Sequence, residues 1–297
     1  MTNFAVPILK SMKKLIFLLL FSGCFFCTFG KTANLRAYLS YSTFYSPEHG
    51  PYLETYLSIQ GKSLTFIKNN NGKFQGSVLV TMIFKQNDSI KDFRKYELFS
   101  PEIEDTTSMN FSFLDQQRIP LPVGKYLFEL TLDDKNADNK PLNIAEDLVI
   151  HFPQNEINVS GIELVESFQK AAPESTTSKS GYDFIPYLDN YFPSTVTKLV
   201  YYAEIYNTLK VLTPNEPFIV FTSIQSYETG KVISSYQKVK RETSKTVNVV
   251  FGEFDISNLP SGKFNLMISV RNKNNEQIAS NSLFFQRINP NAHSETG

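Results

Sequence analysis

The sequence predicts an all-β protein built from two tandem sandwich domains. Three observations predict this fold class: apolar residues alternate with polar ones in short runs, clusters of Asn, Gly, Pro and Asp separate the runs, and segments of the first half recur in the second. An alternation with a period of two indicates strands with one buried face. The chain of 297 residues holds 26 Phe and 15 Tyr but no Trp, a composition that suits a strand-rich core.

Five runs in the first half fit strands, and polar turns separate them. Asn71 and Gly72 form an Asn-Gly pair of the kind that adopts a type I′ hairpin turn. The run 162–172 is ambiguous, and the alternation of Ile162 and Leu164 favours a strand there. The predicted strands of the first half are 36–44, 52–59, 77–84, 125–132 and 147–152.

An internal repeat defines the domain organisation. The segment Leu-Pro-Val-Gly-Lys-Tyr at 121–126 recurs 138 residues later as Leu-Pro-Ser-Gly-Lys-Phe at 259–264. Three further pairs of segments keep the same order, which indicates two copies of one unit. These pairs are 52–59 with 202–208, 78–84 with 218–224, and 147–152 with 282–286.

The repeated segment also indicates the type of sandwich. In immunoglobulin-like domains, a Tyr that follows a turn can donate its hydroxyl to the upstream backbone and form a tyrosine corner. Tyr126 fits this role, while Phe264 occupies the same place in the second copy and has no hydroxyl. We therefore predict immunoglobulin/fibronectin-like sandwiches over 31–156 and 157–290, with a polar tail at 291–297.

An insertion at 171–193 interrupts the second copy. Its first part, 173–181, is small and polar, and we expect it to be mobile. Its second part is rich in aromatic residues, which are favoured at interfaces. The alternative is that these aromatic residues cover the seam between the sandwiches. The candidate binding residues are Tyr182, Phe184, Tyr187, Tyr191 and Phe192.

Residues 1–30 have the pattern of a secretory signal peptide. Met12 is followed by Lys13 and Lys14, a short apolar run and small residues, and the apolar run is too short to span a bilayer. The lysine pair suggests that translation starts at Met12, so that 1–11 is an over-extension. Cleavage after Gly30 is one expectation, and lipidation of Cys24 is the alternative.

The charge balance and the positions of the cysteines limit the classes of partner and bond that the protein can form. The chain has 29 basic and 29 acidic residues, and removal of 1–30 leaves a net charge of −3. Such a chain has no basic excess for binding nucleic acid, and lipidation would be its means of reaching a membrane. Both cysteines, Cys24 and Cys27, lie in the signal, so a chain cut after Gly30 has no thiol.

Several motifs resemble one family of exported proteins. They are RAYLSYSTFYSPEHGPYLETYLSI at 36–59, FLDQQR at 113–118, GYDFIPYLDNYFP at 181–193 and YYAEIYN at 201–207. Together they resemble the N-terminal region of Bacteroidota proteins known by a C-terminal GWxTD motif. The resemblance implies an exported protein and no particular activity. Because this chain has no Trp, it lacks the GWxTD motif itself.

Catalytic chemistry has little support in the sequence. His49, His151 and His293 lie far apart and outside any metal-binding or triad motif, so we predict no enzyme, metal site or cofactor. Glu54 and Glu204 occupy equivalent positions of the repeat. We therefore expect each of them to play the same structural role in its own domain.

Two short motifs resemble acceptor sites for O-glycosylation in exported proteins. They place Ser89 after Asp88 and Thr106 after Asp105, in predicted turns. With the signal peptide and the tandem sandwiches, the prediction is a non-catalytic exported interaction or assembly module of the bacterial cell envelope, periplasmic or associated with the outer membrane, with an envelope protein as partner. The alternative is a surface lipoprotein that binds glycans.

Overall fold

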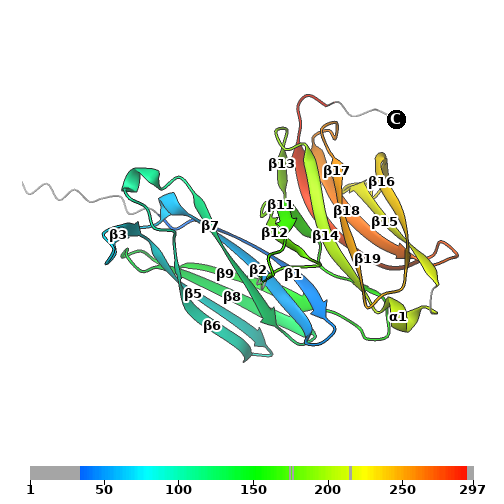
Figure 1. The fold of residues 1–297 in the computed structure, drawn as a ribbon, viewed down its shortest axis with the longest axis horizontal. Coiled ribbons are helices and arrows are strands. Elements are labelled where there is room, and N and C mark those ends of the chain that lie inside the picture. The colour runs from blue at the N-terminus through cyan, green and yellow to red at the C-terminus, as the bar shows by residue number, and fades with distance from the viewer. Residues whose placement is uncertain (1–33, 174, 176, 214–215, 293–297) are drawn as a thin grey trace, which may run out of the picture. The chain divides into compact units, whose positions relative to one another are not determined.

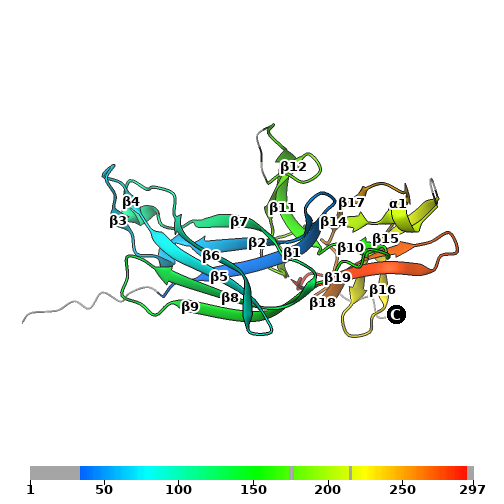
Figure 2. The same ribbon diagram turned by 90° about the horizontal axis from the view of Figure 1, so that it is seen from below.

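The computed structural model describes residues 34–173, 175, 177–213 and 216–292. The predicted signal peptide with Cys24 and most of the predicted polar tail lie outside the described residues. The described residues belong to one compact unit. They form an all-β fold, and its strands make two sandwiches, each of two packed sheets (Figures 1 and 2).

The first sandwich packs a three-stranded sheet on a four-stranded sheet, and all its strand pairs are antiparallel. A small hairpin and two 3-10 turns lie between the strands. The three-stranded sheet has the order β1 (Ala37–Ser46), β2 (Gly50–Gln60), β7 (Ser112–Pro120). The four-stranded sheet has the order β6 (Ser89–Phe99), β5 (Ser77–Gln86), β8 (Gly124–Asp134), β9 (Leu142–Ile150). The remaining elements are β3 (Ile67–Lys68), β4 (Phe74–Gln75), η1 (Gly61–Ser63) and η2 (Thr106–Ser108).

The second sandwich repeats this arrangement and adds short edge strands. In one sheet, β14 (Lys198–Tyr206) pairs on one side with β10 (Asn158–Val159) and β11 (Glu163–Lys170), and it also pairs with β17 (Val247–Asp255). β12 (Tyr182–Pro186) extends this sheet from β11. The other sheet has the order β13 (Tyr191–Pro193), β19 (Gln277–Ile288), β18 (Gly262–Arg271), β15 (Pro217–Ser226), β16 (Val232–Thr243). A short helix, α1 (Thr208–Val211), precedes β15.

The repeat seen in the sequence falls on equivalent strands. Its four pairs of segments lie on β2 and β14, β5 and β15, β8 and β18, and β9 and β19. Each copy has its own apolar core, because alternate side chains of each strand point between its two sheets. On β5, for example, Val78, Val80, Met82 and Phe84 are fully buried. This strand order is that of immunoglobulin/fibronectin-like sandwiches.

The crossover between the two sheets contains the hydrogen bond expected of a tyrosine corner. The Tyr126 hydroxyl donates to the carbonyl oxygen of Pro122 at 2.8 Å, at the point where the chain passes from β7 to β8. In the second copy Phe264 is buried at the equivalent place, and its ring packs over Gly262. A Cβ at Gly262 would lie 2.9 Å from that ring, which explains the glycine.

The type I′ hairpin turn lies at a different place from the one that the sequence predicts. Residues 70–72 do connect the paired strands β3 and β4, but only Gly72 has a positive φ there. A type I′ turn needs two such residues. Asn87 and Asp88 satisfy this requirement, with φ of 48° and 62°, between β5 and β6. The type I′ geometry therefore belongs to Asn87–Asp88.

Candidate functional site

A buried polar cluster lies where the two sandwiches meet. Both β2 and β14 carry the pattern Tyr-x-Glu-x-Tyr, at 52–56 and at 202–206. On β2, Leu53 and Leu57 point into the core of the first sandwich, so Glu54 points from the opposite face. Glu54 is nevertheless fully buried, because this outer face is covered as well. Its cover comes from the insertion and the second sandwich.

Backbone contacts hold the two sandwiches together at this seam. The Tyr45 N–H donates to the Tyr206 hydroxyl at 3.0 Å, and the Gly161 N–H donates to the Thr43 carbonyl oxygen at 2.8 Å. Gly161 approaches β1 so closely that a Cβ there would lie 2.7 Å from the Thr43 nitrogen. A residue without a side chain is therefore required at this position.

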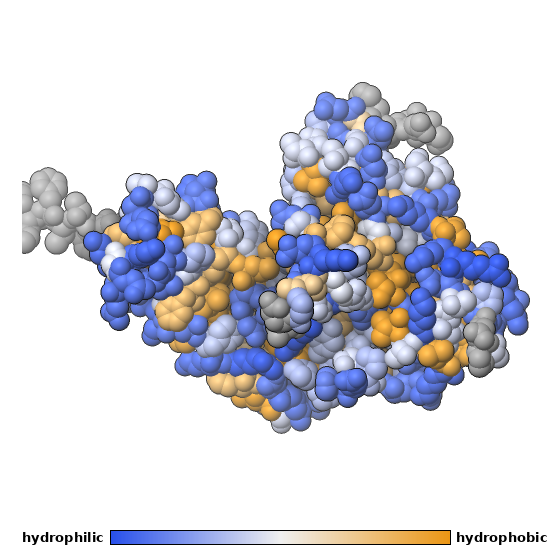
Figure 3. Space-filling view, viewed as in Figure 1, coloured by the Kyte–Doolittle hydropathy of each residue, from blue (hydrophilic) through white to orange (hydrophobic). Residues whose placement is uncertain are grey.

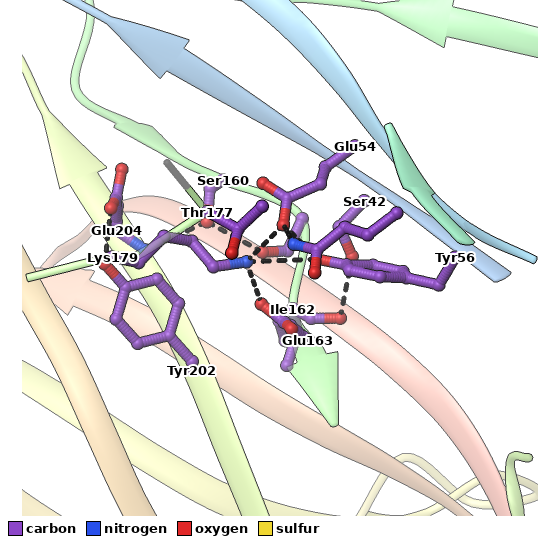
Figure 4. A network of polar contacts seen from close by, with 12 residues as sticks. Ser42, Glu54, Tyr56, Ser160, Ile162, Glu163, Thr177, Lys179, Tyr202 and Glu204 are labelled. Atoms are coloured by element: carbon purple, nitrogen blue, oxygen red, sulfur yellow. Dashed lines mark hydrogen bonds and ion pairs between the residues drawn. The ribbon is translucent and has the colours of Figure 1, made fainter. Parts of the chain in front are cut away.

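Lys179 of the insertion lies at the centre of the cluster (Figure 4). Its ammonium donates to Glu54 Oε1 at 2.9 Å, to the Tyr56 hydroxyl at 3.0 Å and to Glu163 Oε2. Only 5% of the residue is exposed. Four aromatic rings also lie within reach of Nζ, and such rings attract a cation through their faces. They belong to Phe44, Tyr56, Phe184 and Tyr202, with centroids 4.7–5.9 Å from Nζ.

The position of Lys179 corrects the expectation that 173–181 is a mobile polar stretch. The Lys179 N–H donates to the Tyr182 carbonyl oxygen at 2.8 Å, and Arg118 of β7 donates to the Thr177 carbonyl oxygen at 2.7 Å. These contacts hold the described part of the stretch against both sandwiches. The small polar residues around Lys179 give no sign of this in the sequence.

Glu54 is surrounded by donors. Arg118 Nε donates to Glu54 Oε2 at 3.0 Å, the Tyr56 hydroxyl donates to Oε1 at 3.0 Å, and Gln116 also donates to Oε1. Burial alone would raise the pKa of Glu54, but the charges of Lys179 and Arg118 outweigh burial and lower this pKa below 4.5. Glu54 is therefore held as a carboxylate.

Glu163 of β11 has far fewer hydrogen-bond donors around its carboxyl group than Glu54 has. Its Oε2 accepts from Lys179, whereas its buried Oε1 has no hydrogen-bond partner. Burial raises the pKa of Glu163 above 4.5, against the attraction of Lys179, and the charge of Glu54 adds to this rise. The pKa values of the two acids that contact Lys179 thus shift in opposite directions, that of Glu54 down and that of Glu163 up.

Glu204 occupies the place in the second copy that Glu54 occupies in the first. The hydroxyls of Tyr202 and Tyr206 donate to its carboxylate, and its N–H donates to Ser160 Oγ at 2.9 Å. Each glutamate thus accepts hydroxyl donors from tyrosine on its own strand, in line with their equivalent positions. The lysine and arginine contacts occur at Glu54, so the two copies differ in charge pairing.

The five aromatic residues of the insertion do not form one exposed surface. Phe184 and Phe192 are 8% and 2% exposed, so neither side chain is available to a partner. Tyr182, Tyr187 and Tyr191 are half-buried. Tyr182 packs with Phe184 at 6.2 Å between ring centroids, and Tyr187 stacks on Phe192 at 4.6 Å. Phe184 fits the alternative expectation, that the aromatic residues cover the seam between the sandwiches. It packs in one apolar cluster with Phe44 of the first sandwich.

A cavity of about 330 Å³ lies beside the cluster, between β1 and the second sandwich. Glu163 and Tyr56 are among its lining residues, so the cavity adjoins the buried cluster. Its other polar and aromatic lining includes Tyr38, Tyr41, Tyr187, Asp189 and Asn190. Tyr191 and Phe192 do not contribute to its wall.

The two predicted glycosylation residues lie on the surface. Ser89 follows the Asn87–Asp88 turn and is exposed, and Thr106 is exposed at the start of η2. The Asp105 carboxylate accepts a hydrogen bond from the Thr107 N–H at 2.8 Å and so caps that turn. Both hydroxyls are therefore accessible, and their modification stays a prediction.

None of the described helices has the length and apolar character needed to cross a membrane. Within the same part of the chain, no group of three or more His, Cys, Asp or Glu side chains is placed to hold a metal ion.

No family model matches the sequence, and no curated protein matches it. Among solved structures, the chain is similar to the fibronectin(III)-like modules of Clostridium thermocellum CbhA, with 10% sequence identity and a TM-score of 0.22. That similarity covers 82% of this chain and 91% of the other.

Proposed function

We propose that the protein is a non-catalytic exported module of the bacterial cell envelope that acts in interaction or assembly. The observation that carries this proposal is the seam cluster around Lys179. Its charged and hydroxyl groups contact one another across the seam, and together they join two sandwiches into one unit. Such a unit presents its surfaces to a partner in one fixed arrangement.

The location in the envelope rests on the N-terminal sequence. The signal pattern of 1–30 supports export, and the resemblance to exported Bacteroidota proteins supports an envelope setting. Release at Lys31 would leave the protein in the periplasm, and lipidation of Cys24 would hold it at a membrane. Mass spectrometry of the N-terminal peptide of the protein purified from cells distinguishes the two.

One accessible surface suits a protein partner. β6 is an edge strand with its outer backbone unpaired, and it carries Phe93 and Phe99 at 51% and 54% exposure. Large apolar side chains on an unpaired edge are typical of interaction sites. Figure 3 shows that apolar side chains reach the surface among polar ones on the face it displays.

The test is a cross-linked pull-down of the tagged protein from whole cells. We expect specific envelope proteins to be captured by the wild type and lost in a Phe93→Asp, Phe99→Asp variant. A Val239→Asp variant on the exposed edge strand β16 is the matched control, and it should retain the partners. Capture no greater than that of an untagged strain would contradict the proposal.

The cavity beside the seam favours a second candidate, a surface lipoprotein that binds glycans. Tyr38, Tyr41 and Tyr187 supply rings that can stack on sugars, and Asp189 and Asn190 can bind hydroxyl groups. Glycan-array binding should then be lost in Tyr187→Ala and kept in Tyr191→Ala, because Tyr191 does not line the cavity. Binding to no glycan would remove this candidate.

A further inference from the structure

The arrangement of Lys179, Glu163 and Glu54 is that of an amine, an acid and a base placed for reaction. Lys179 Nζ contacts both carboxyl groups in a buried site enclosed by aromatic rings. Both glutamates are almost completely buried, with side chains 0% and 2% exposed. Close placement of reacting groups in a buried site removes much of the barrier to a bond-forming step.

The two carboxyl groups are suited to different roles. Glu54 has Arg118, Gln116 and Tyr56 as further donors, which keep it in the charged form that is able to accept a proton. Glu163 has an unpartnered oxygen, and its raised pKa favours the protonated acid. A protonated carboxyl group can be attacked by an amine, because its hydroxyl can leave as water.

We propose that Lys179 and Glu163 form an intramolecular amide bond, with Glu54 as the general base. Glu54 takes a proton from the Lys179 ammonium, and the neutral amine attacks Cδ of protonated Glu163. The new N–C bond forms and the C–O bond to the hydroxyl breaks. Of the two protons that nitrogen loses, one leaves with the hydroxyl as water and the other stays on Glu54. No oxidant, metal or further reactant is required.

Two other features fit this chemistry. The cavity of about 330 Å³ is lined by Glu163 and Tyr56, so the released water has a space to enter beside the reacting acid. Both cysteines of the chain, Cys24 and Cys27, lie in the predicted signal, so a chain cut after Gly30 has no disulfide available. An amide bond would fix the insertion to β11 covalently in such a protein.

The first test is the mass of the full chain, purified from cells under denaturing conditions. The amide bond lowers the mass by one water, about 18 Da, relative to the sequence from the observed N-terminus. Trypsin should not cut after Lys179, and fragmentation should place the bond between Lys179 and Glu163. Full mass with free Lys179 overturns the proposal, and a bond from Lys179 to Glu54 overturns the assignment of Glu163 as the reacting acid.

An exposed ion pair in the same chain provides an internal control. Lys198 Nζ lies 2.9 Å from Glu253 Oε1, the same distance as Lys179 Nζ from Glu54 Oε1. The side chains of Lys198 and Glu253, however, are both about half exposed. Trypsin should cut after Lys198 completely. A mass deficit that maps to Lys198, or to a modified terminus, contradicts the proposal, because it would not arise from the buried site.

Three variants test the roles of the groups. Lys179→Arg should restore the full mass, because a guanidinium does not replace the amine as nucleophile. Glu163→Gln should still react but release ammonia, a deficit of about 17 Da. Glu54→Gln should accumulate the unlinked chain. Unchanged linkage in Glu54→Gln would overturn its role as base. The wild-type measurement stands even where a variant fails to fold.

Discussion

The Tyr206 hydroxyl accepts a hydrogen bond of 3.0 Å from the Tyr45 N–H and donates to Glu204 of its own strand. One side chain of the second sandwich therefore satisfies a backbone group of the first and a buried carboxylate at the same time. The rings of Tyr45 and Tyr206 also meet edge to face at 5.7 Å. This contact makes Tyr206 a structural link between the two domains that is separate from Lys179.

Tyr206→Phe should reduce the free energy of unfolding by about 1–3 kcal/mol, because the Tyr45 N–H and Glu204 each lose a partner at a buried site. Chemical denaturation followed by circular dichroism measures this change. Tyr227→Phe is the control, since Tyr227 is 54% exposed and should change stability little. Equal stability of Tyr206→Phe and the wild type would show that the seam does not depend on this hydroxyl.

Lys179→Ala should destabilise the protein by about 3–5 kcal/mol, because it leaves Glu54 and Glu163 buried without their shared partner. Lys240→Ala is the matched control, because the Lys240 side chain is 69% exposed in its ion pair with Glu242. We expect the control to lie within about 0.5 kcal/mol of the wild type. If both variants unfold at the same denaturant concentration, the cluster contributes no stability.

Tyr126→Phe should cost about 0.5–1.5 kcal/mol, the net value of one hydrogen bond, because the ring can still pack while the bond to Pro122 is lost. Thermal unfolding monitored by circular dichroism provides the measurement. Tyr38→Phe, at a residue with 52% exposure, supplies the baseline for removal of a tyrosine hydroxyl. An unchanged melting temperature would argue against a stabilising corner.

Gly161→Ala should destabilise the seam by about 1–3 kcal/mol, the usual cost of overpacking. The added Cβ would lie 2.7 Å from the Thr43 nitrogen and 3.0 Å from Ser42 Cβ, so the chain must shift away from β1. Limited proteolysis of the native protein should show faster cleavage in the segment 151–157, which connects β9 to β10. A variant as resistant and as stable as the wild type would contradict the close approach.

Alkaline pH should weaken the fold through its buried tyrosines. Burial first, and then the charge of Glu204, raise the pKa of Tyr206 well above 10.0, and the pKa of Tyr202 is raised by the same causes. The unfolded chain therefore releases these protons at a lower pH than the folded chain, so their contribution is complete below pH 10 and declines above it. Denaturation at increasing pH should show a smaller decline for Tyr206→Phe than for the wild type. Parallel curves would contradict the raised pKa.

Much of the fold could be predicted from local pattern. Period-two alternation predicted β1, β2, β5, β8 and β9 of the first copy but missed β6 and β7. The repeat of 121–126 predicted two equivalent copies. The hydroxyl contact of Tyr126 was predictable as well, since its acceptor lies four residues upstream. The turn at Asn87–Asp88 carried a weaker signal than Asn71–Gly72, yet it has the type I′ geometry.

A repeated polar pattern on two equivalent strands is the trace of the seam in the sequence. Both copies carry Tyr-x-Glu-x-Tyr on a strand whose other face is apolar, and a charged residue at such a position usually faces solvent. The repetition of the pattern was the available hint that both outer faces are covered. The aromatic residues of the insertion could be read either way, because exposed and packed rings look the same in a sequence.

The sequence by itself determined five strands of the first copy, the presence of two copies and the corner, because contacts close in the chain and regular alternation specify them. Only the tertiary structure decided that Lys179 is buried, since its partner Glu54 lies 125 residues away and its own neighbours are small and polar. A lysine is buried only where opposite charges and rings surround it. Those groups come from β1, β2, β11, β12 and β14, which meet only in the folded chain.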